Sequence, residues 1–128
     1  MARHRRHMVL LPSGGGGAQS GRADLAEVAT ASAALVGLPH KLTGSDIDIR
    51  TDYIGAGYGA VTDDGREALR LLARTEGILL DPVYTAKAMA GLIDDVRKGR
   101  LGSSDTTVFI HTGGTPAVFA YRDELLAR

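Results

Sequence analysis

The chain has 128 residues, of which 44% are apolar, and its 15 lysine plus arginine residues balance its 15 aspartate plus glutamate residues. That length suffices for one domain with a modest core, and the balanced charge gives no electrostatic case for binding nucleic acid or a membrane surface. The sequence has no cysteine, which excludes disulfides and cysteine metal sites, and no apolar run approaches the roughly 20 residues of a transmembrane helix, so we expect a cytoplasmic protein.

The composition changes at about residue 20. Residues 1–20 combine a basic start with the glycine run "SGGGG", which is typical of a flexible linker. The run lacks the preceding strand and the spaced lysine of a phosphate-binding P-loop. We therefore expect a flexible segment over residues 1–20 and a folded part over 21–128.

The first predicted elements are a helix and a strand. "RADLAEVATASAALVGL" has helical periodicity and a stop signal at Gly37. Its expected inner face consists of Leu25, Val28 or Ala29, Ser32, and Leu35 or Val36. "DIDIR", residues 46–50, alternates apolar and polar residues, which predicts a short strand.

A glycine-rich loop, "YIGAGYGAV", separates this strand from a second helix. "TDDGREALRLLARTEG" predicts a helix capped by Thr62 or Asp63 and ended by Gly77. Its expected inner face consists of Ala68, Leu69, Leu72 and Ala73.

Two further strands and two helices complete the chain. "ILL", residues 78–80, predicts a short buried strand, and Pro82 suits the first turn of a helix capped by Asp81 and ending near Gly99. The expected inner face of that helix consists of Ala88, Met89, Leu92, Ile93 and Val96. "TTVFIHT", residues 106–112, is rich in β-forming residues and leads through two glycines into a helix over "TPAVFAY".

The order of elements predicts an α/β fold. We expect a partial three-layer arrangement with about three short, mostly parallel strands and four flanking helices. Three strands make a thin sheet, and both faces of a parallel sheet need cover. The pattern therefore indicates one end of a larger fold.

Lys87, in "DPVYTAKAM", is a candidate catalytic amine because a buried lysine with a lowered pKa can form a Schiff base. It lies in the opening turn of an amphipathic helix, beside residues expected to face inward. We therefore expect an exposed or snorkelling lysine instead.

"HTGGTP", residues 111–116, joins a strand end to a helix start. Its backbone N–H groups could bind an anion or a polar ring atom, or its glycines could simply permit a tight turn. We expect His111 to be a satisfied core histidine, and the spacing of the four histidines predicts no metal site.

Tyr58 and Tyr84 each lie at the edge of an irregular segment. Such tyrosines can be packing residues with a hydrated hydroxyl group. They can also transfer protons if a pocket shifts their pKa. The residue pattern leaves both roles open.

The stretch from about Tyr53 to Tyr121 resembles a known family. "EG-LLDPVY--KAM--LI" and "HTGG-PA-FAY" occur in the order and spacing of the D-cysteine desulfhydrase / 1-aminocyclopropane-1-carboxylate (ACC) deaminase family, C-terminal portion. These are pyridoxal-phosphate enzymes with a tryptophan synthase β-like fold. The resemblance implies that this chain uses pyridoxal 5'-phosphate and a small amino-acid substrate.

The resemblance also implies site residues. Tyr58 and Tyr84 match the two tyrosines that face the substrate, and are the implied catalytic residues. Thr112 matches the hydroxyl near the pyridine nitrogen of the cofactor. Gly113 and Thr85 are the other implied cofactor-binding residues. Threonine at 85 and 112 resembles the desulfhydrase branch, where the deaminase branch has glutamate and leucine.

The implied reaction converts D-cysteine and water to pyruvate, sulfide and ammonia. The family's Schiff-base lysine lies in an N-terminal half, and Lys41, Lys87 and Lys98 do not match it. We therefore expect a fragment that is inactive alone, with a missing N-terminal half as partner or a homodimeric parent enzyme. The alternatives are an ACC deaminase, an L-cysteate sulfo-lyase or a non-catalytic truncated remnant.

Overall fold

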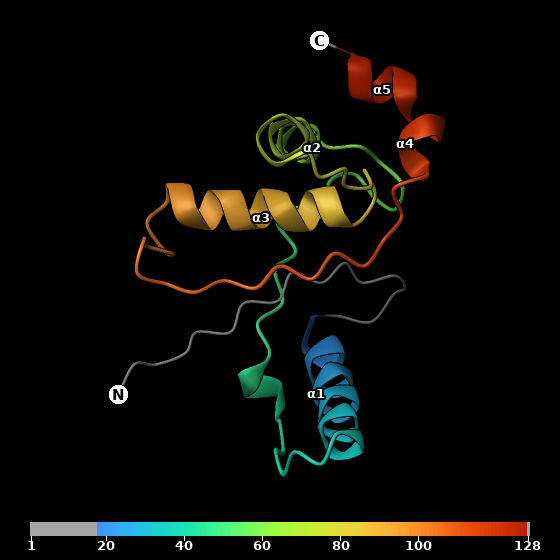
Figure 1. The fold of residues 1–128 in the computed structure, drawn as a ribbon. Coiled ribbons are helices and arrows are strands. Elements are labelled where there is room, and N and C mark those ends of the chain that lie inside the picture. Colours follow the sequence, from blue (N-terminus) through green and yellow to red (C-terminus); the bar gives the residue numbers. More distant parts are fainter. Residues whose placement is uncertain (1–17, 128) are drawn as a thin grey trace. The chain divides into compact units, whose positions relative to one another are not determined.

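The computed structural model describes residues 18–127 (Figure 1). The chain divides into two compact units, residues 1–51 and 52–128. The flexible segment predicted for residues 1–20 falls outside the described residues, except that residues 18–20 open the first helix. Among the helices described, none combines the length and the apolar character needed to cross a membrane.

The described residues of the first unit form helix α1 (Ala18–Leu35), the short 3-10 helix η1 (Gly44–Asp46) and irregular segments around η1. Gly37 ends α1 as predicted, with a positive φ of 72°. A small apolar cluster joins Ala26 of α1 to Ile47 and Ile49.

The predicted inner face of α1 was right at Leu25, which packs against this cluster, and wrong towards the C-terminal end of the helix. Leu35 is 88% exposed and Val28 is also exposed, whereas Ala26 is buried. Helix α1 presents only a narrow stripe to its unit, because a short extended segment, rather than a sheet, packs against it. Leu35 and Val36, near its C-terminal end, are therefore left exposed by the described residues of the unit.

The predicted parallel sheet is not confirmed, because residues 18–127 contain no β-strand. In the first predicted strand Asp46 belongs to η1, and the apolar alternation survives as burial of Ile47 and Ile49. In the second, Ile78 and Leu79 are exposed and only Leu80 is buried. A β-strand is defined by hydrogen bonds to a neighbouring strand. Residues 78–80 and 106–112 form no such ladder with other described residues.

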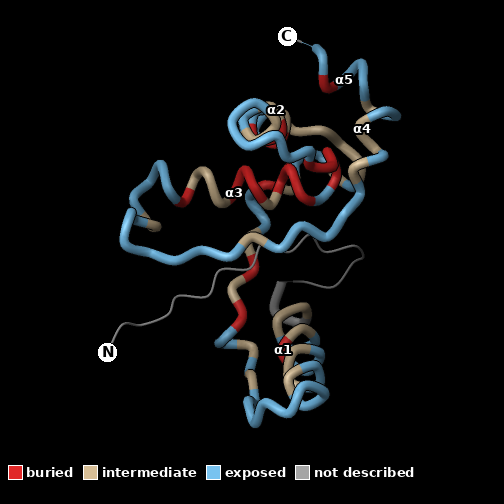
Figure 2. The backbone as a smooth tube through the Cα atoms, in the orientation of Figure 1, coloured by how far each residue is buried: buried red, intermediate tan, exposed pale blue. Residues whose placement is uncertain are grey.

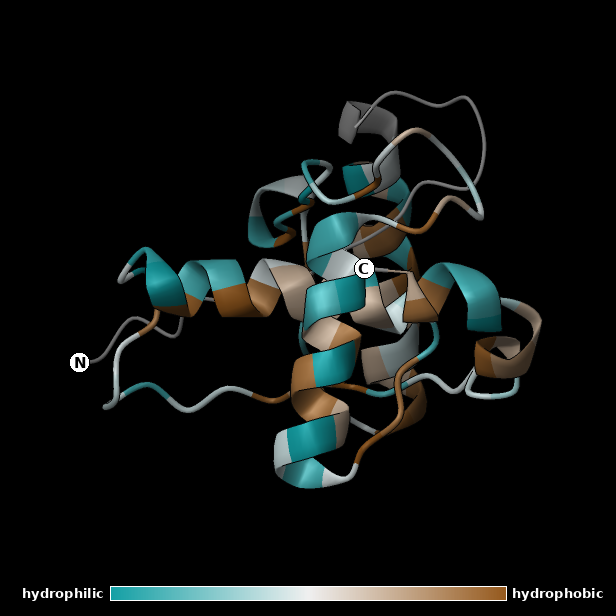
Figure 3. Cartoon of the chain, turned by 90° about the horizontal axis from the view of Figure 1, so that it is seen from above, coloured by the Kyte–Doolittle hydropathy of each residue, from teal (hydrophilic) through white to brown (hydrophobic). Residues whose placement is uncertain are grey.

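The second unit is built on helices α2 (Asp63–Glu76) and α3 (Thr85–Arg97), which pack against each other (Figure 1). Both boundaries of α2 agree with the sequence, since the Thr62 hydroxyl accepts a hydrogen bond from the Gly65 N–H and Gly77 ends the helix with a left-handed φ. Figure 2 shows that burial is concentrated in the N-terminal half of α3. Figure 3 shows hydrophobic and hydrophilic residues alternating around the helices, as expected for amphipathic segments.

The core of this unit joins both helices to the C-terminal end of the chain. Helices α4 (Ala117–Ala120) and α5 (Arg122–Leu126) follow an extended segment, and the Arg70 guanidinium donates hydrogen bonds to the carbonyl oxygens of Leu125 and Ala127. The buried members of the core are Tyr53, Ala68, Leu69, Leu80, Ala86, Met89, Ala90 and Leu125. The prediction that Val96 faces inward was wrong, because Val96 lies near the end of α3 and is exposed.

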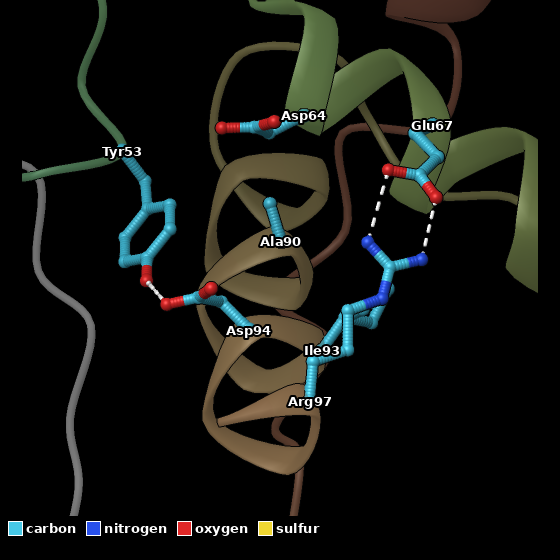
Figure 4. A pocket seen from close by; sticks show the side chains of 7 residues that line it. All are labelled: Tyr53, Asp64, Glu67, Ala90, Ile93, Asp94 and Arg97. Carbon is cyan, nitrogen blue, oxygen red and sulfur yellow. Dashed lines mark hydrogen bonds and ion pairs between the residues drawn. The ribbon is translucent and has the colours of Figure 1, made fainter.

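A small pocket of about 60 Å³ lies between α2 and α3 (Figure 4). Tyr53 donates a hydrogen bond of 2.5 Å to Asp94 on one side, and Arg97 forms a bidentate pair with Glu67 on the other. Both polar contacts connect neighbouring elements of the second unit, so we assign this pocket a structural role.

Acid should weaken the Asp94 contacts. Hydrogen bonds from Lys98 and Tyr53 lower the pKa of Asp94 from its ordinary 3.8 to about 2. A carboxylate whose pKa is lowered by folding stabilises the folded state at any pH above its pKa in the unfolded chain. For Asp94 that stabilisation disappears as the pH falls from 3.8 through about 2. Thermal unfolding followed by circular dichroism should therefore show Asp94→Asn to be less pH-dependent than the native chain between these values. An identical acid profile for both chains would contradict this.

Candidate functional site

The two tyrosines singled out in the sequence lie together in the structure. The Tyr84 hydroxyl donates a hydrogen bond of 2.9 Å to the Tyr58 hydroxyl. The ring centroids are 5.9 Å apart in an edge-to-face arrangement with an interplanar angle of 66°. Tyr58 is 78% exposed and Tyr84 is 42% exposed, so this tyrosine pair forms part of the surface of the second unit.

The hydrogen bond changes the acidity of the pair. Donation to Tyr58 is the largest cause that raises the pKa of Tyr84 above its ordinary 10.0, with smaller effects of desolvation and of the charge of Asp81. Tyr84 therefore keeps its proton at neutral pH. A neutral phenol in contact with a second phenol can donate a proton or orient a polar substrate group.

Asp81 fixes the position of Tyr84. Its buried carboxylate accepts hydrogen bonds from the backbone N–H groups of Val83, Tyr84 and Thr85 at 2.7 to 2.9 Å. Burial would raise the pKa of Asp81, but these hydrogen bonds and one from the Thr85 hydroxyl outweigh burial and lower it. The carboxylate therefore remains ionised and caps the turn that leads into α3.

Thr85 has a structural partner in this arrangement. Its hydroxyl donates to Asp81 Oδ2 at 2.6 Å and accepts from the Asp81 N–H at 2.8 Å. The residue is buried, so its hydroxyl is already used within the chain. Its role towards a cofactor stays a prediction.

The segment that contains Thr112 and Gly113 lies against the same turn. His111 Nε2 is 2.9 Å from the Leu79 carbonyl oxygen, and the Thr115 hydroxyl also donates to that oxygen. The expectation of a core position for His111 was wrong, because its side chain is exposed at the edge of an extended segment. Thr112 and Gly113 are both exposed, and their roles towards a cofactor stay predictions.

Gly114 makes the closest approach to the Asp81 turn. Its φ is +85°, and a Cβ atom on it would lie only 2.9 Å from Asp81 Cβ. Of the two interpretations of "HTGGTP", close packing is therefore realised at Gly114. Gly113 also has a positive φ, of 99°, but a Cβ atom there would meet nothing within 4 Å.

The two glycines offer a matched test of this contact. Gly113→Ala should lower the free energy of unfolding by about 1 kcal/mol, the cost of a left-handed backbone for a residue with a side chain. Gly114→Ala should lower it by about 1–3 kcal/mol more, because the new methyl group overlaps Asp81. Urea unfolding of both variants measures the difference, and equal losses would show that Gly114 does not pack against Asp81.

Lys87 is the largest departure from the sequence prediction. It was expected to be exposed or snorkelling, but it is 1% exposed and its Nζ donates a hydrogen bond of 2.7 Å to the Ile54 carbonyl oxygen. Burial lowers the pKa of this amine. The periodicity of a single helix could not reveal a partner 33 residues earlier in the chain.

Sequence reasoning treated Asp81 only as a helix cap and missed its place at the centre of the site. The signal was present in "DPVYT", because an aspartate followed four residues later by threonine can form reciprocal side-chain and backbone hydrogen bonds. The contact between Asp81 and Gly114 could not be predicted from the local sequence, because Gly114 belongs to a segment distant along the chain.

Comparisons with known proteins place this geometry in context. Residues 11–113 match the family model described as "Pyridoxal-phosphate dependent enzyme". A solved structure described as a crystal structure of an ACC deaminase homologue matches with 39% sequence identity and a TM-score of 0.64. The match covers 80% of this chain and 30% of that one, so this chain spans less than a third of its length.

Proposed function

The chain belongs to the family of pyridoxal-phosphate dependent enzymes, and from this premise we propose that it supplies the substrate-facing tyrosines of a lyase acting on D-cysteine. The observation that carries the proposal is the hydrogen bond between the Tyr84 and Tyr58 hydroxyl groups, made from segments 26 residues apart. Both side chains are exposed, so they are accessible to a substrate.

Three coarser predictions from the sequence are confirmed. Membership of the D-cysteine desulfhydrase / ACC deaminase family, its tryptophan synthase β-like type of fold and its cofactor, pyridoxal phosphate, follow from the family match and from the similarity to the ACC deaminase homologue. The reaction and the substrate remain our proposal.

The residues of this chain fit part of what the cofactor requires. Thr112 is exposed and carries a hydroxyl group, and the space beside Gly113 is unoccupied by other residues, since a Cβ atom there would meet nothing within 4 Å. Lys87 does not fit as a covalent anchor, because its amine is buried and donates to a backbone carbonyl. We therefore propose that Thr112 and Gly113 contact the cofactor and that the anchoring lysine belongs to residues other than those of this chain.

The proposed reaction is β-elimination, in which D-cysteine and water give pyruvate, hydrogen sulfide and ammonia. Pyridoxal phosphate supplies a sink for the electron pair left at Cα when its proton is removed. The tyrosine pair then has a defined task. The Tyr84 O–H donates to the Tyr58 oxygen and leaves the Tyr58 O–H proton free for the departing sulfur, so Tyr58 passes its proton to sulfur and receives that of Tyr84 in its place.

The extended segments support the idea that this chain completes a larger sheet. Val108 and Ile110 are 81% and 76% exposed, whereas Phe109 between them packs on the core of the second unit. Such alternation is typical of a strand that packs against helices on one face and leaves its other face exposed until a further element packs there. We propose that residues 78–80 and 106–112 become parallel strands when a complementary β-segment is present.

Deamination of ACC is the second candidate. It is favoured by the similarity to a structure described as an ACC deaminase homologue. Thr85 and Thr112 differ from the glutamate and leucine expected in that branch, which is why we place D-cysteine first.

A chimera tests the choice of substrate. The matching segment of the ACC deaminase homologue would be replaced by this chain, and the product would be purified with pyridoxal phosphate. We expect sulfide and pyruvate from D-cysteine, little 2-oxobutanoate from ACC and little sulfite from L-cysteate. A chimera that binds the cofactor and releases 2-oxobutanoate faster than pyruvate would favour the second candidate.

A further inference from the structure

The side chain of Lys87 occupies an unusual place for an amine. It is among the most buried side chains of the second unit. Its aliphatic stem runs past the first turn of α2, where a Cβ atom on Gly65 would lie 3.6 Å from Lys87 Cγ. At its end, Nζ donates to the Ile54 carbonyl oxygen. An amine is rarely buried in this way without a specific partner, because removing its charge from water is costly.

The carbonyl that Lys87 contacts opens the segment that presents Tyr58. This segment, which we call the Tyr58 loop, covers residues 54–60 and forms no helix or strand. Gly55 and Gly59 have φ values of 76° and 78°, which side-chain-bearing residues rarely adopt. A loop with this backbone freedom needs contacts outside itself to hold one conformation.

Helix α3 is connected to both members of the tyrosine pair. Tyr84 lies immediately before α3, and Lys87, on its first turn, reaches the Tyr58 loop. We propose that Lys87 is a positioning residue, whose hydrogen bond to Ile54 holds the Tyr58 loop so that the Tyr58 hydroxyl meets that of Tyr84. The catalytic meaning of this role rests on the proposed function, whereas the geometric role does not.

The direct readout is the tyrosine pair in the purified chain of 128 residues. Tyrosine labelled with carbon-13 at Cζ gives one NMR signal for each of the four tyrosines, and Tyr→Phe variants assign them. In the native chain we expect the Tyr84 signal to titrate above the ordinary pKa of 10.0, and in Tyr58→Phe this pKa should fall towards that value. Lys87→Met should reproduce the Tyr58→Phe result, while the exposed Lys41→Met should leave the raised pKa of Tyr84 unchanged.

Chemical rescue separates the amine from the packing of its stem. The chain has no cysteine, so Lys87→Cys creates a single alkylation site that can be modified in the unfolded state before refolding. Alkylation with 2-bromoethylamine restores an amine at nearly the original length, whereas 1-bromopropane gives an uncharged chain of similar size. The amine should restore the raised pKa of Tyr84, and the propyl group should not.

Three results would overturn the proposal. The first is a folded Lys87→Met chain in which Tyr84 still titrates as in the native chain. The second is restoration by the propyl group as well as by the amine, which would mean that packing alone holds the loop. The third is failure of both amine-free chains to fold, which would make Lys87 a requirement of the whole unit. None of these results depends on catalysis, so they are distinguishable from failure of the proposed function.

Discussion

Tyr84→Phe in the chimera should reduce kcat/KM for D-cysteine by about 10²-fold or more, as expected for loss of a proton-donating group. The substitution removes only the hydroxyl that donates to Tyr58, and the ring keeps its edge-to-face contact. Initial rates of pyruvate release measure the effect. Retention of bound cofactor, followed by its visible absorbance, shows that the variant is intact.

The pair should also behave as one unit. Tyr58→Phe should lower kcat/KM as well, and the double variant should lose much less than the product of the two separate losses, because residues that act together are not additive. Tyr53→Phe is the matched control, since the Tyr53 hydroxyl donates to Asp94 in the pocket between α2 and α3, away from the tyrosine pair. Multiplicative losses, or an equal loss in Tyr53→Phe, would contradict the role of the pair.

Asp81→Ala should produce the largest loss of stability in the second unit. It leaves the N–H groups of Val83, Tyr84 and Thr85 without their acceptor inside a buried turn. Hydrogen bonds to a charged group contribute roughly 1.5–3 kcal/mol each and are not additive, so we expect the free energy of unfolding to fall by about 3 kcal/mol or more.

Two variants control this measurement by urea unfolding. Asp81→Asn keeps one acceptor oxygen and should fall between the native chain and Asp81→Ala. Asp63→Ala removes an exposed carboxylate whose contact is a surface ion pair with Arg66, and it should change stability by less than about 1 kcal/mol. A loss in Asp81→Ala no greater than that in Asp63→Ala would show that the turn does not depend on its carboxylate.

Local signals in the sequence predicted several helix boundaries, although α3 begins at Thr85 and not in the turn of Pro82. Thr62 and Gly77 delimit α2, and Gly37 ends α1, because capping hydroxyls and left-handed glycines act within a few residues of themselves. The inner face of α2 was also predicted correctly, since Ala68 and Leu69 are buried in the core and Leu72 packs against it, but the faces of α1 and α3 were wrong near their C-terminal ends. Leu35 and Val96 had the right spacing, but no element among residues 18–127 covers them.

The three strands predicted from the sequence depended on partners outside the segments themselves. The alternation in residues 106–112 is real, since Phe109 faces the core and Val108 does not. An extended segment becomes a strand only when another strand pairs with it, and the residues described provide none for this segment. The prediction that Lys87 is exposed was wrong for a related reason, because the partner of its amine is a backbone carbonyl in a loop distant in the sequence.

The candidate site was predicted through the family resemblance rather than through residue pattern. Pattern alone left Tyr58 and Tyr84 open between packing and proton transfer, and the structure then placed their hydroxyl groups 2.9 Å apart. The cofactor-binding role implied for Thr85 stays a prediction, and the structure adds that its hydroxyl donates to and accepts from Asp81.

The most direct test of the central claim is one rate measurement. Pyruvate release from D-cysteine would be compared between the cofactor-loaded chimera and the same chimera with both Tyr58 and Tyr84 replaced by phenylalanine. We predict steady release with an equal amount of sulfide from the first and at least about 10²-fold slower release from the second. Equal rates from the two proteins, or no release from a fully loaded chimera, would contradict the proposal that this chain supplies the reactive tyrosines of a D-cysteine lyase.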